Sequence, residues 1–181
     1  SHEASAGVMA DVTARLTGIP GVCHATFGPG ATNISTGAGC AFLDRSAVIV
    51  FTSELEEKFR SRTSQMNIDH QKLFRPLTKA TFRLNPENAA EIISKSFSLC
   101  REEYPGPVHI GLPAGIADAT VIEWPEPEQV SERFYFSNDT GKIISLLRSS
   151  SKPLIAVGRT SARLLPPIDL IRFLDKFRDN R

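Results

Sequence analysis

Three short apolar runs constrain what this chain can fold into. Residues 46–53, SAVIVFTS, are continuously apolar over their centre and do not alternate between apolar and polar side chains. Residues 21–26, GVCHAT, and residues 106–113, GPVHIGLP, have the same character. Such runs are typical of parallel strands covered by helices on both faces. We therefore predict an α/β fold with a mainly parallel sheet and helices on both faces.

The segments between these runs read as helices and loops. Residues 2–18 have apolar residues at helical spacing, and residues 31–44 have the many small residues of a helix pressed closely onto a sheet. Residues 54–79 are polar and irregular, which predicts a loop with short helical pieces. A brief strand is expected over residues 81–84.

A well-marked helix is expected within residues 85–106. Asn85 is the predicted N-cap, and Pro86 stands at the first helical position, where its missing N–H costs nothing. Ala90, Ile93, Phe97 and Cys100 lie on one face of this helix.

The chain is expected to contain one nearly complete domain and part of another. We place the first domain at residues 1–118 and a polar, proline-bearing linker at residues 119–138. Residues 139–181 then read as a helix, a strand at 152–158 and a second helix, which is the truncated beginning of a further α/β domain.

Composition excludes several classes of function. The 21 basic and 20 acidic residues are mixed along the chain, so neither nucleic acid nor a membrane surface is an expected partner. Cys23, Cys40 and Cys100 are odd in number, widely spaced and set among apolar residues, which favours buried reduced thiols and a cytoplasmic protein. The histidines lack a spacing to carboxylates that would indicate a metal site. His24 reads as a core residue within a strand, and His70 as a residue of the surface or of a loop.

The stretch ATFGPGATN, residues 25–33, is the candidate binding turn. It follows a predicted strand, where ligands of open α/β sheets bind. It is not a dinucleotide fingerprint, because Asn33 stands where the last glycine is required, and no phosphate-binding Gly-Lys-Ser/Thr occurs. The alternative is a tight strand-to-helix turn without a ligand, with Thr32 or Asn33 capping the following helix.

Four segments in register carry a family resemblance: HEASAG, GVCHATFGPGATN, FLDRSAVIVFTS and YPGPVHIGLP. In this order and spacing they resemble the pyrimidine-binding domain of thiamine-diphosphate-dependent enzymes, and within these the acetolactate synthase and pyruvate oxidase group. The resemblance covers residues 2–116, and residues from 142 onward are similar to the opening of that group's central domain. It implies that a strand–helix–strand preceding Glu3 is missing here.

The resemblance implies that the turn holds the aminopyrimidine ring of thiamine diphosphate. Glu3 matches the glutamate that faces a ring nitrogen and shares a proton with it, so we expect its carboxyl to be desolvated and its pKa raised. The expected ring contacts are Thr26, Gly28, Pro29, Gly30 and Asn33, with Asn33 either a helix cap or a polar neighbour of the ring.

A glutamine in the loop after the next strand approaches the substrate side of the cofactor in this group. Gln65 is the candidate here, although strict counting places Met66 at that position. The chain has no Gly-Asp-Gly motif followed by an asparagine, so Mg²⁺ and the diphosphate would be held by a domain outside this chain.

Two departures concern the substrate and FAD. Ser53-Glu54 stands where acetolactate synthases carry Gly-Gln, and Ala114-Gly115 replaces a Lys-Asp pair. They put in doubt the usual substrate binding and the FAD that many members retain.

The function expected from the resemblance is part of a 2-keto acid decarboxylase and carboligase. Such an enzyme removes carbon dioxide from pyruvate and transfers the two-carbon unit to a second keto acid, in a homodimer or homotetramer with the site at the subunit interface. The alternatives are another thiamine-diphosphate enzyme (an oxidase, acetyltransferase or simple decarboxylase) and a non-catalytic relative that keeps the fold.

Overall fold

The computed structural model describes most of the chain, which divides into two compact units, Ser1–Val130 and Ser131–Arg181. Each unit is described by itself. The described residues are 2–102, 104–116, 119–120, 138–158 and 167–178.

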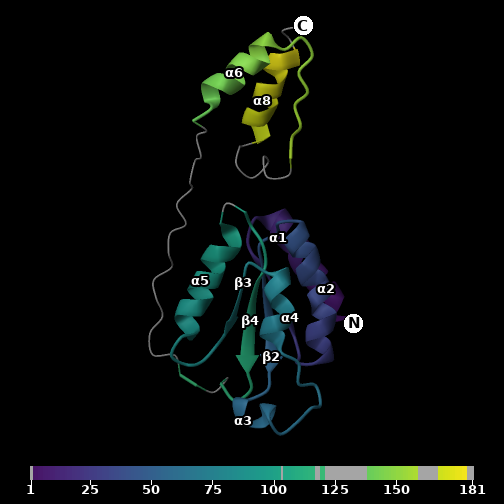
Figure 1. Ribbon diagram of the computed structural model, residues 1–181, viewed down its shortest axis with the longest axis vertical. Coiled ribbons are helices and arrows are strands. Elements are labelled where there is room, and N and C mark those ends of the chain that lie inside the picture. The colour runs from purple at the N-terminus through teal and green to yellow at the C-terminus, as the bar shows by residue number, and fades with distance from the viewer. Residues whose placement is uncertain (1, 103, 117–118, 121–137, 159–166, 179–181) are drawn as a thin grey trace. The chain divides into compact units, whose positions relative to one another are not determined.

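A four-stranded, fully parallel sheet forms the centre of the first unit (Figure 1). The strand order is β1-β2-β4-β3, so the last strand lies between the second and the third. This confirms the predicted α/β class with a parallel sheet. The strands are β1 Gly21–Ala25, β2 Val48–Glu54, β3 Ala80–Arg83 and β4 Val108–Pro113.

Helices cover both faces of this sheet. On one face α1, α2 and α4 pack over a core cluster that includes Val48, Val50 and Phe74. On the other face α5 packs over a second cluster that includes Ile49 and Ile110. The helices are α1 Glu3–Thr17, α2 Pro29–Leu43, α3 Glu57–Arg60, α4 His70–Phe74, the 3₁₀ turn η1 Arg75–Leu77 and α5 Ala89–Arg101.

The apolar run of β2 has a direct structural cause. Successive side chains of a strand point to opposite faces, so Val48 and Val50 enter one core cluster and Ile49 enters the other. All three are fully buried. A strand covered by helices on both sides is therefore apolar on both faces where the two core clusters pack on it, as the sequence predicts for residues 48–51.

Two helices begin at positions other than those expected. Helix α2 starts at Pro29, so Thr32 and Asn33 lie inside it and neither caps it. Helix α5 starts at Ala89 with Asn88 as N-cap, which makes the assignment of Asn85 wrong. Asn85 and Asn88 instead exchange two hydrogen bonds of 2.8 Å, each side-chain oxygen accepting from the other residue's backbone N–H, and this closed turn delays the helix.

The second unit contains two described helices, α6 Thr140–Ser149 and α8 Pro167–Arg178. Residues 152–158 do not form the expected strand, and the side chain of Leu154 is 95% exposed. A strand requires a neighbouring strand to satisfy its backbone groups, and the described residues of this unit offer none. Most of the expected linker, residues 121–137, lies outside the described residues.

The cysteines only partly follow the expectation. None of the three is in a disulfide, but Cys40 is exposed on α2, whereas Cys23 and Cys100 are buried. Burial raises the pKa of the Cys23 thiol to about 12, so this thiol stays protonated at neutral pH.

The two helices before and after β1 touch through a pair of glycines. A Cβ placed on Gly7 of α1 would lie 2.8 Å from the Cα of Gly37 on α2, and a Cβ placed on Gly37 would lie 2.6 Å from the Cα of Gly7. The backbones therefore meet directly. Glu3 contacts Asn33, and Arg15 approaches Asp44 at 3.4 Å further along, which shows that the two helices run in the same direction.

This contact predicts a strong and local effect of added methyl groups. We expect Gly37→Ala to lower the free energy of unfolding by about 1–3 kcal/mol, because the new Cβ overlaps backbone atoms that cannot swing aside. Urea unfolding measures the change.

Gly39→Ala on the same helix is the matched control. Its Cβ would meet only Leu77 Cδ2, at an ordinary 3.8 Å, so we expect no loss and a gain of up to about 1 kcal/mol from helix propensity. Equal losses at positions 37 and 39 would contradict the close packing.

Candidate functional site

The glycine turn is shaped by contacts within the chain. Gly28 has φ +64°, and a Cβ placed on it would lie 2.7 Å from the Cβ of Met66. A Cβ on Gly30 would lie 2.8 Å from Cγ2 of Thr26. The space beside Gly28 is therefore taken by Met66, and the space beside Gly30 by the methyl group of Thr26, whether or not a ligand binds. Thr26 and Pro29 are exposed at the surface of the turn.

Glu3 and Asn33 come together beside this turn. The Asn33 amide Nδ2 donates to Glu3 Oε2 over 3.1 Å. Pro29, Asn33 and Gly37 are spaced four residues apart, so they share the face of α2 that meets α1. The Gly7–Gly37 contact places the first turn of α1 against the first turns of α2. The carboxyl of Glu3, which belongs to α1, consequently lies against the face of α2 that also carries the exposed ring of Pro29.

The expected rise in the pKa of Glu3 does not occur in this chain. The backbone N–H of Glu3 itself, followed by the Asn33 amide, holds the pKa of the carboxyl below its ordinary value. Both groups donate to the charged form, and the side chain is only partly covered by the described residues. Glu3 is therefore an ionised hydrogen-bond acceptor here.

The loop after β2 brings Met66, not Gln65, to the turn. Gln65 is exposed, while Met66 packs on Gly28 and has a left-handed backbone with φ +57°. The Asn67 side chain donates to the carbonyls of Arg60 and Thr63 over 2.6 and 3.0 Å and ties the loop to itself. A methionine with positive φ is strained, and surrounding contacts must hold it in place.

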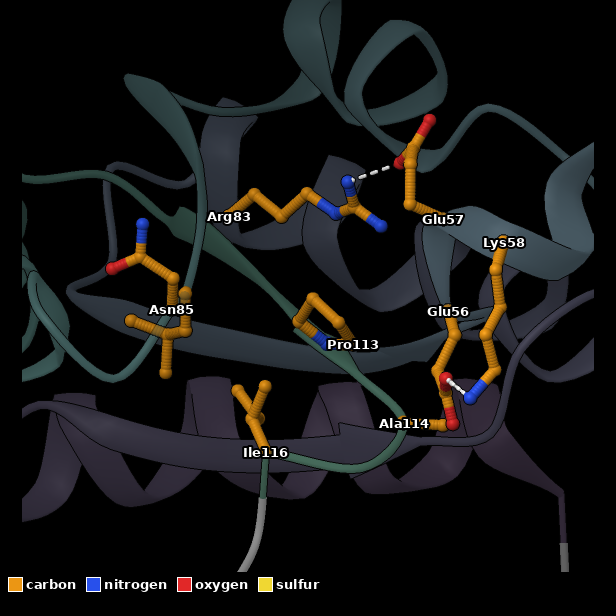
Figure 2. A pocket seen from close by; sticks show the side chains of 9 residues that line it. Glu56, Glu57, Lys58, Arg83, Asn85, Pro113, Ala114 and Ile116 are labelled. Carbon is orange, nitrogen blue, oxygen red and sulfur yellow. Dashed lines mark hydrogen bonds and ion pairs between the residues drawn. The ribbon is translucent and has the colours of Figure 1, made fainter. Parts of the chain in front are cut away.

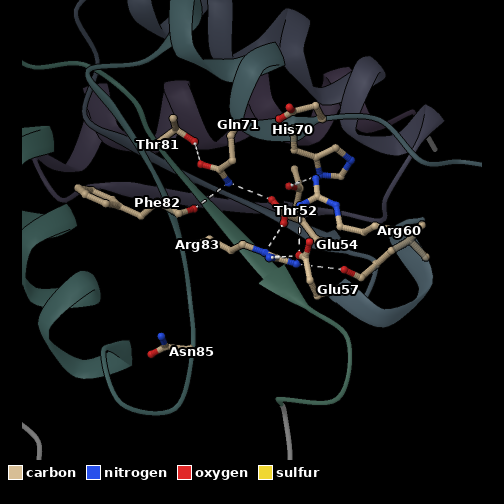
Figure 3. A network of polar contacts seen from close by, with 12 residues as sticks. Thr52, Glu54, Glu57, Arg60, His70, Gln71, Thr81, Phe82, Arg83 and Asn85 are labelled. Atoms are coloured by element: carbon tan, nitrogen blue, oxygen red, sulfur yellow. Dashed lines mark hydrogen bonds and ion pairs between the residues drawn. The ribbon is translucent and has the colours of Figure 1, made fainter. Parts of the chain in front are cut away.

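A buried polar network lies under this loop (Figure 3). The Thr52 hydroxyl lies 2.9 Å from Nδ1 of His70 and 2.8 Å from Nε2 of His109. The other ring nitrogen of His109 lies 2.6 Å from the hydroxyl of Thr81, and the ring stacks on Phe74 at 4.2 Å between centroids. His70, expected at the surface, is only 1% exposed.

The network continues to a buried ion pair. The hydroxyl of Thr81 donates to Gln71 Oε1 over 2.7 Å, and Gln71 Nε2 donates to Glu54 Oε1 over 2.9 Å. Glu54 is 3% exposed and its Oε2 lies 2.8 Å from Nε of Arg83. A Cβ on Gly111 would overlap the Glu54 carboxyl at 2.2 Å. The unusual Glu54 is thus a paired interior residue of the fold.

The sequence interpretation missed this network and misplaced two histidines. His24 was expected inside the protein, yet it is exposed on β1 and contacts Ser53 over 3.0 Å. The available signal was the alternation in β2, where Thr52 and Glu54 follow Val48 and Val50 on one face.

A cavity of about 520 Å³ opens at the carboxyl ends of β2, β3 and β4 (Figure 2). Leu84, Pro113 and Ile116 give it apolar walls. Its charges are already paired, because Arg83 meets Glu57 and Lys58 meets Glu56. Ala114, where the family would place a lysine, also lines it, and Gly115 lies next to Glu56.

Two classes of site are not found among the described residues. No group of three or more histidine, cysteine, aspartate or glutamate side chains there is placed to hold a metal ion. Within the same residues, no helix combines the length and apolar character needed to cross a membrane.

Comparison with known proteins identifies the region that carries the glycine turn. Residues 1–73 match the sequence profile of the family described as thiamine pyrophosphate enzyme, N-terminal TPP binding domain. These residues belong to that domain family. Thiamine pyrophosphate is the same molecule as thiamine diphosphate. Within this TPP-binding domain lie Glu3, Asn33, the glycine turn and Met66.

The relatives of the TPP-binding domain include acetolactate synthases. The chain is 37% identical to a probable acetolactate synthase large subunit of Methanocaldococcus jannaschii, over 87% of this chain and 28% of that protein. It is 33% identical to the acetolactate synthase isozyme 3 large subunit of Escherichia coli, over 87% of this chain and 29% of that protein. A probable 2-ketoarginine decarboxylase of Pseudomonas aeruginosa is 34% identical over 68% of this chain and 23% of that protein. The chain spans less than a third of the length of these relatives.

The buried histidines predict loss of stability in mild acid. Burial lowers the pKa of His109 to about 3, and it lowers that of His70 as well. The pKa of a histidine in an unfolded chain is about 6.5. Between these two pKa values His109 binds a proton in the unfolded chain but not in the folded chain. The free energy of unfolding is therefore highest above about pH 6.5 and falls as the pH drops. From His109 we expect a loss of about 2 kcal/mol between pH 7 and pH 5.

Urea unfolding at pH 7 and pH 5, followed by circular dichroism, measures this loss. His109→Gln should lower stability at pH 7 but remove much of its pH dependence. His24→Asn, a change at an exposed histidine, should keep the dependence of the native chain. An unchanged pH dependence in His109→Gln would show that His109 is not the titrating group.

Proposed function

We propose that this chain supplies the pyrimidine-binding part of a thiamine-diphosphate-dependent enzyme of the acetolactate synthase kind. The proposed reaction is decarboxylation of a 2-keto acid such as pyruvate, followed by transfer of the two-carbon unit to a second keto acid. The observation that carries the proposal is the Glu3 carboxylate, held by Asn33 beside the glycine turn of a TPP-binding domain.

The residues of the turn fit an aminopyrimidine ring. The exposed ring of Pro29 offers an apolar surface, and Thr26 is exposed next to it, while Met66 and Thr26 fill the space beside the buried Gly28 and Gly30. Glu3 offers an ionised carboxylate that accepts a hydrogen bond or a proton from a ring nitrogen. Asn33 orients this carboxylate and occupies one of its oxygens. When bound, the cofactor supplies an electron sink for the carbanion that decarboxylation leaves.

When the aminopyrimidine ring covers the Glu3 carboxylate, Glu3 would become able to share a proton with the ring. Removing the carboxylate from water raises its pKa, which opposes the two hydrogen bonds that lower it now. The proposed role of Glu3 is therefore to hold a proton between its Oε and the ring nitrogen. Asn33 serves as a positioning residue in this arrangement.

Further parts of the proposal concern groups outside the described site. Mg²⁺ and the diphosphate would be held by another domain, and a homodimer or homotetramer would complete the site at a subunit interface. The proposed boundaries remain 1–118 for the pyrimidine-binding domain, 119–138 for a linker and 139–181 for the start of a central domain. The proposal of a cytoplasmic location rests on three cysteines that are not in disulfides. Ala114-Gly115, in place of a charged pair, argues against FAD.

A simple decarboxylase is the second candidate function. The similarity to a probable 2-ketoarginine decarboxylase supports it, and so does Ala114-Gly115 in place of a charged pair beside the cavity. Both candidates use the same cofactor and the same role for Glu3. They differ in the fate of the two-carbon unit.

Cofactor titration combined with carbon dioxide release tests the proposal. The longest native polypeptide that carries this chain is titrated with thiamine diphosphate and Mg²⁺ by calorimetry, and release from pyruvate is followed in the same samples. We expect binding by both the native protein and Glu3→Gln, with release reduced about 10²- to 10⁴-fold in the variant. The amide still accepts from Asn33 but holds no proton for the ring.

Glu91→Gln is the matched control, since Glu91 is an exposed glutamate in the first turn of α5. It should bind cofactor and release carbon dioxide like the native protein. Binding without release from pyruvate would redirect the substrate to other keto acids. Carbon dioxide release with an aldehyde as product, and no 2-hydroxy-3-keto acid such as acetolactate, would favour the simple decarboxylase. No binding by the native protein would overturn the proposal and favour a non-catalytic relative.

A further inference from the structure

The buried network has one permitted direction, and Gln71 sets it. Gln71 Nε2 lies 2.9 Å from Glu54 Oε1 and 3.1 Å from the carbonyl oxygen of Phe82. Both neighbours are acceptors only, so the amide nitrogen must face them and the amide oxygen must face Thr81. Because that oxygen cannot donate, the hydroxyl of Thr81 must donate to it. The hydroxyl oxygen of Thr81 is then left to accept from His109.

The protons of both histidines follow from this step. His109 Nδ1 must carry a proton to donate to Thr81, and burial keeps the ring neutral, so Nε2 is an acceptor. The Thr52 hydroxyl therefore donates to His109 Nε2 and accepts from His70 Nδ1–H. The relay runs from His70 through Thr52, His109, Thr81 and Gln71 to Glu54. Figure 3 shows its two ends, His70 with Thr52 and Thr81 with Gln71 and Glu54.

This relay joins the two ends of the loop that carries Met66. Glu54 ends β2, directly before residues 55–69, and His70 and Gln71 begin α4, directly after them. Arg83, paired with Glu54, also donates to the carbonyl of Leu55 over 3.2 Å and pairs with Glu57 over 2.6 Å. Both ends of the loop are thus fixed to the sheet by buried groups, while its middle packs on Gly28.

Thr52 is the member that closes the relay. Its single hydroxyl serves both histidines, and the side chain is fully buried on the sheet. Without the hydroxyl, Nε2 of His109 and Nδ1–H of His70 both lose their partner inside the protein. A buried polar atom without a partner is costly, so α4 would shift to recover hydrogen bonds and would move the end of the loop with it.

We propose that Thr52 is a positioning residue, which fixes residues 55–69 through this one-way relay and so keeps Met66 packed on the glycine turn. The consequence for catalysis rests on the proposed function, since only there does the turn hold the cofactor. The positioning of the loop and the proton arrangement of the two histidines stand apart from any ligand.

Hydrogen exchange measured by mass spectrometry tests the positioning. Thr52→Val keeps the shape of the side chain and removes the hydroxyl, whereas Thr52→Ser keeps the hydroxyl. In the full-length protein we expect amides within residues 55–69 to exchange at least tenfold faster in Thr52→Val and at the native rate in Thr52→Ser. Helix α5, which packs on the opposite face of the sheet, is the internal reference and should not change.

Three outcomes would overturn the proposal. Equal acceleration in the loop and in α5 would show general loss of stability, and no acceleration in the loop would show that the hydroxyl does not hold it. The third concerns protons: ¹⁵N spectra of histidine-labelled native protein should show His70 and His109 neutral and protonated on Nδ1. A proton on Nε2 of His109 would contradict the relay.

Kinetics extend the test to catalysis. If pyruvate is a substrate, Thr52→Val should raise KM at least fivefold or lower kcat by a similar factor, and Thr52→Ser should restore the native values. If the native protein binds no thiamine diphosphate, the proposed function fails, yet the exchange rates and histidine spectra still decide the role of Thr52.

Discussion

The backbone contact between Gly7 and Gly37 is the constraint on which the candidate site depends. Two helices that run in the same direction approach more closely than any side chain would allow. One turn nearer the start of each helix, this approach brings Glu3 of α1 to Asn33 of α2. Pro29 lies another turn nearer the start of α2. The Glu3 carboxylate, the Asn33 amide and the Pro29 ring thus lie together because Gly7 and Gly37 have no side chains to hold the helices apart.

The interior of the sheet is divided along the direction of its strands. On the face covered by α1, α2 and α4, β2 begins with Val48 and Val50 and ends with Thr52 and Glu54. Val48 and Val50 pack against the helices, and Thr52 and Glu54 hold the ends of the loop 55–69 at the carboxyl edge of the sheet. Polar residues are costly inside a protein unless every donor finds an acceptor, and here the acceptors Glu54 and Phe82 fix the order of all the others.

Local pattern was sufficient for the class of fold but not for its polar interior. The runs around Val48 to Phe51 predict a parallel strand because burial on both faces leaves a continuous signal. His24 and His109 both sit in such runs, yet one is exposed on an edge strand and the other lies in a central one, and strand order is not a local property. The expected strand at 152–158 failed for the same reason, since apolar composition cannot supply a neighbouring strand.

The site itself was half predictable. Glu3, Asn33 and the glycine turn were found through four segments in register, and the structure brings them together. The pKa of Glu3 could not be foreseen, because it depends on which groups donate to the carboxylate and on how much of it is covered. Met66 was one residue from the choice made on sequence, and only the fold shows which of the two neighbours turns inward.

The contact between Gly28 and Met66 joins two positions that are 38 residues apart in the sequence. Both have positive φ, and the space that a side chain at position 28 would need is taken by the methionine. Mutational drift at one of them is therefore limited by the identity of the other. A larger residue at position 28 is acceptable only in a chain whose loop leaves the place of Met66 empty. Positions 28 and 66 are therefore expected to covary among members of the family.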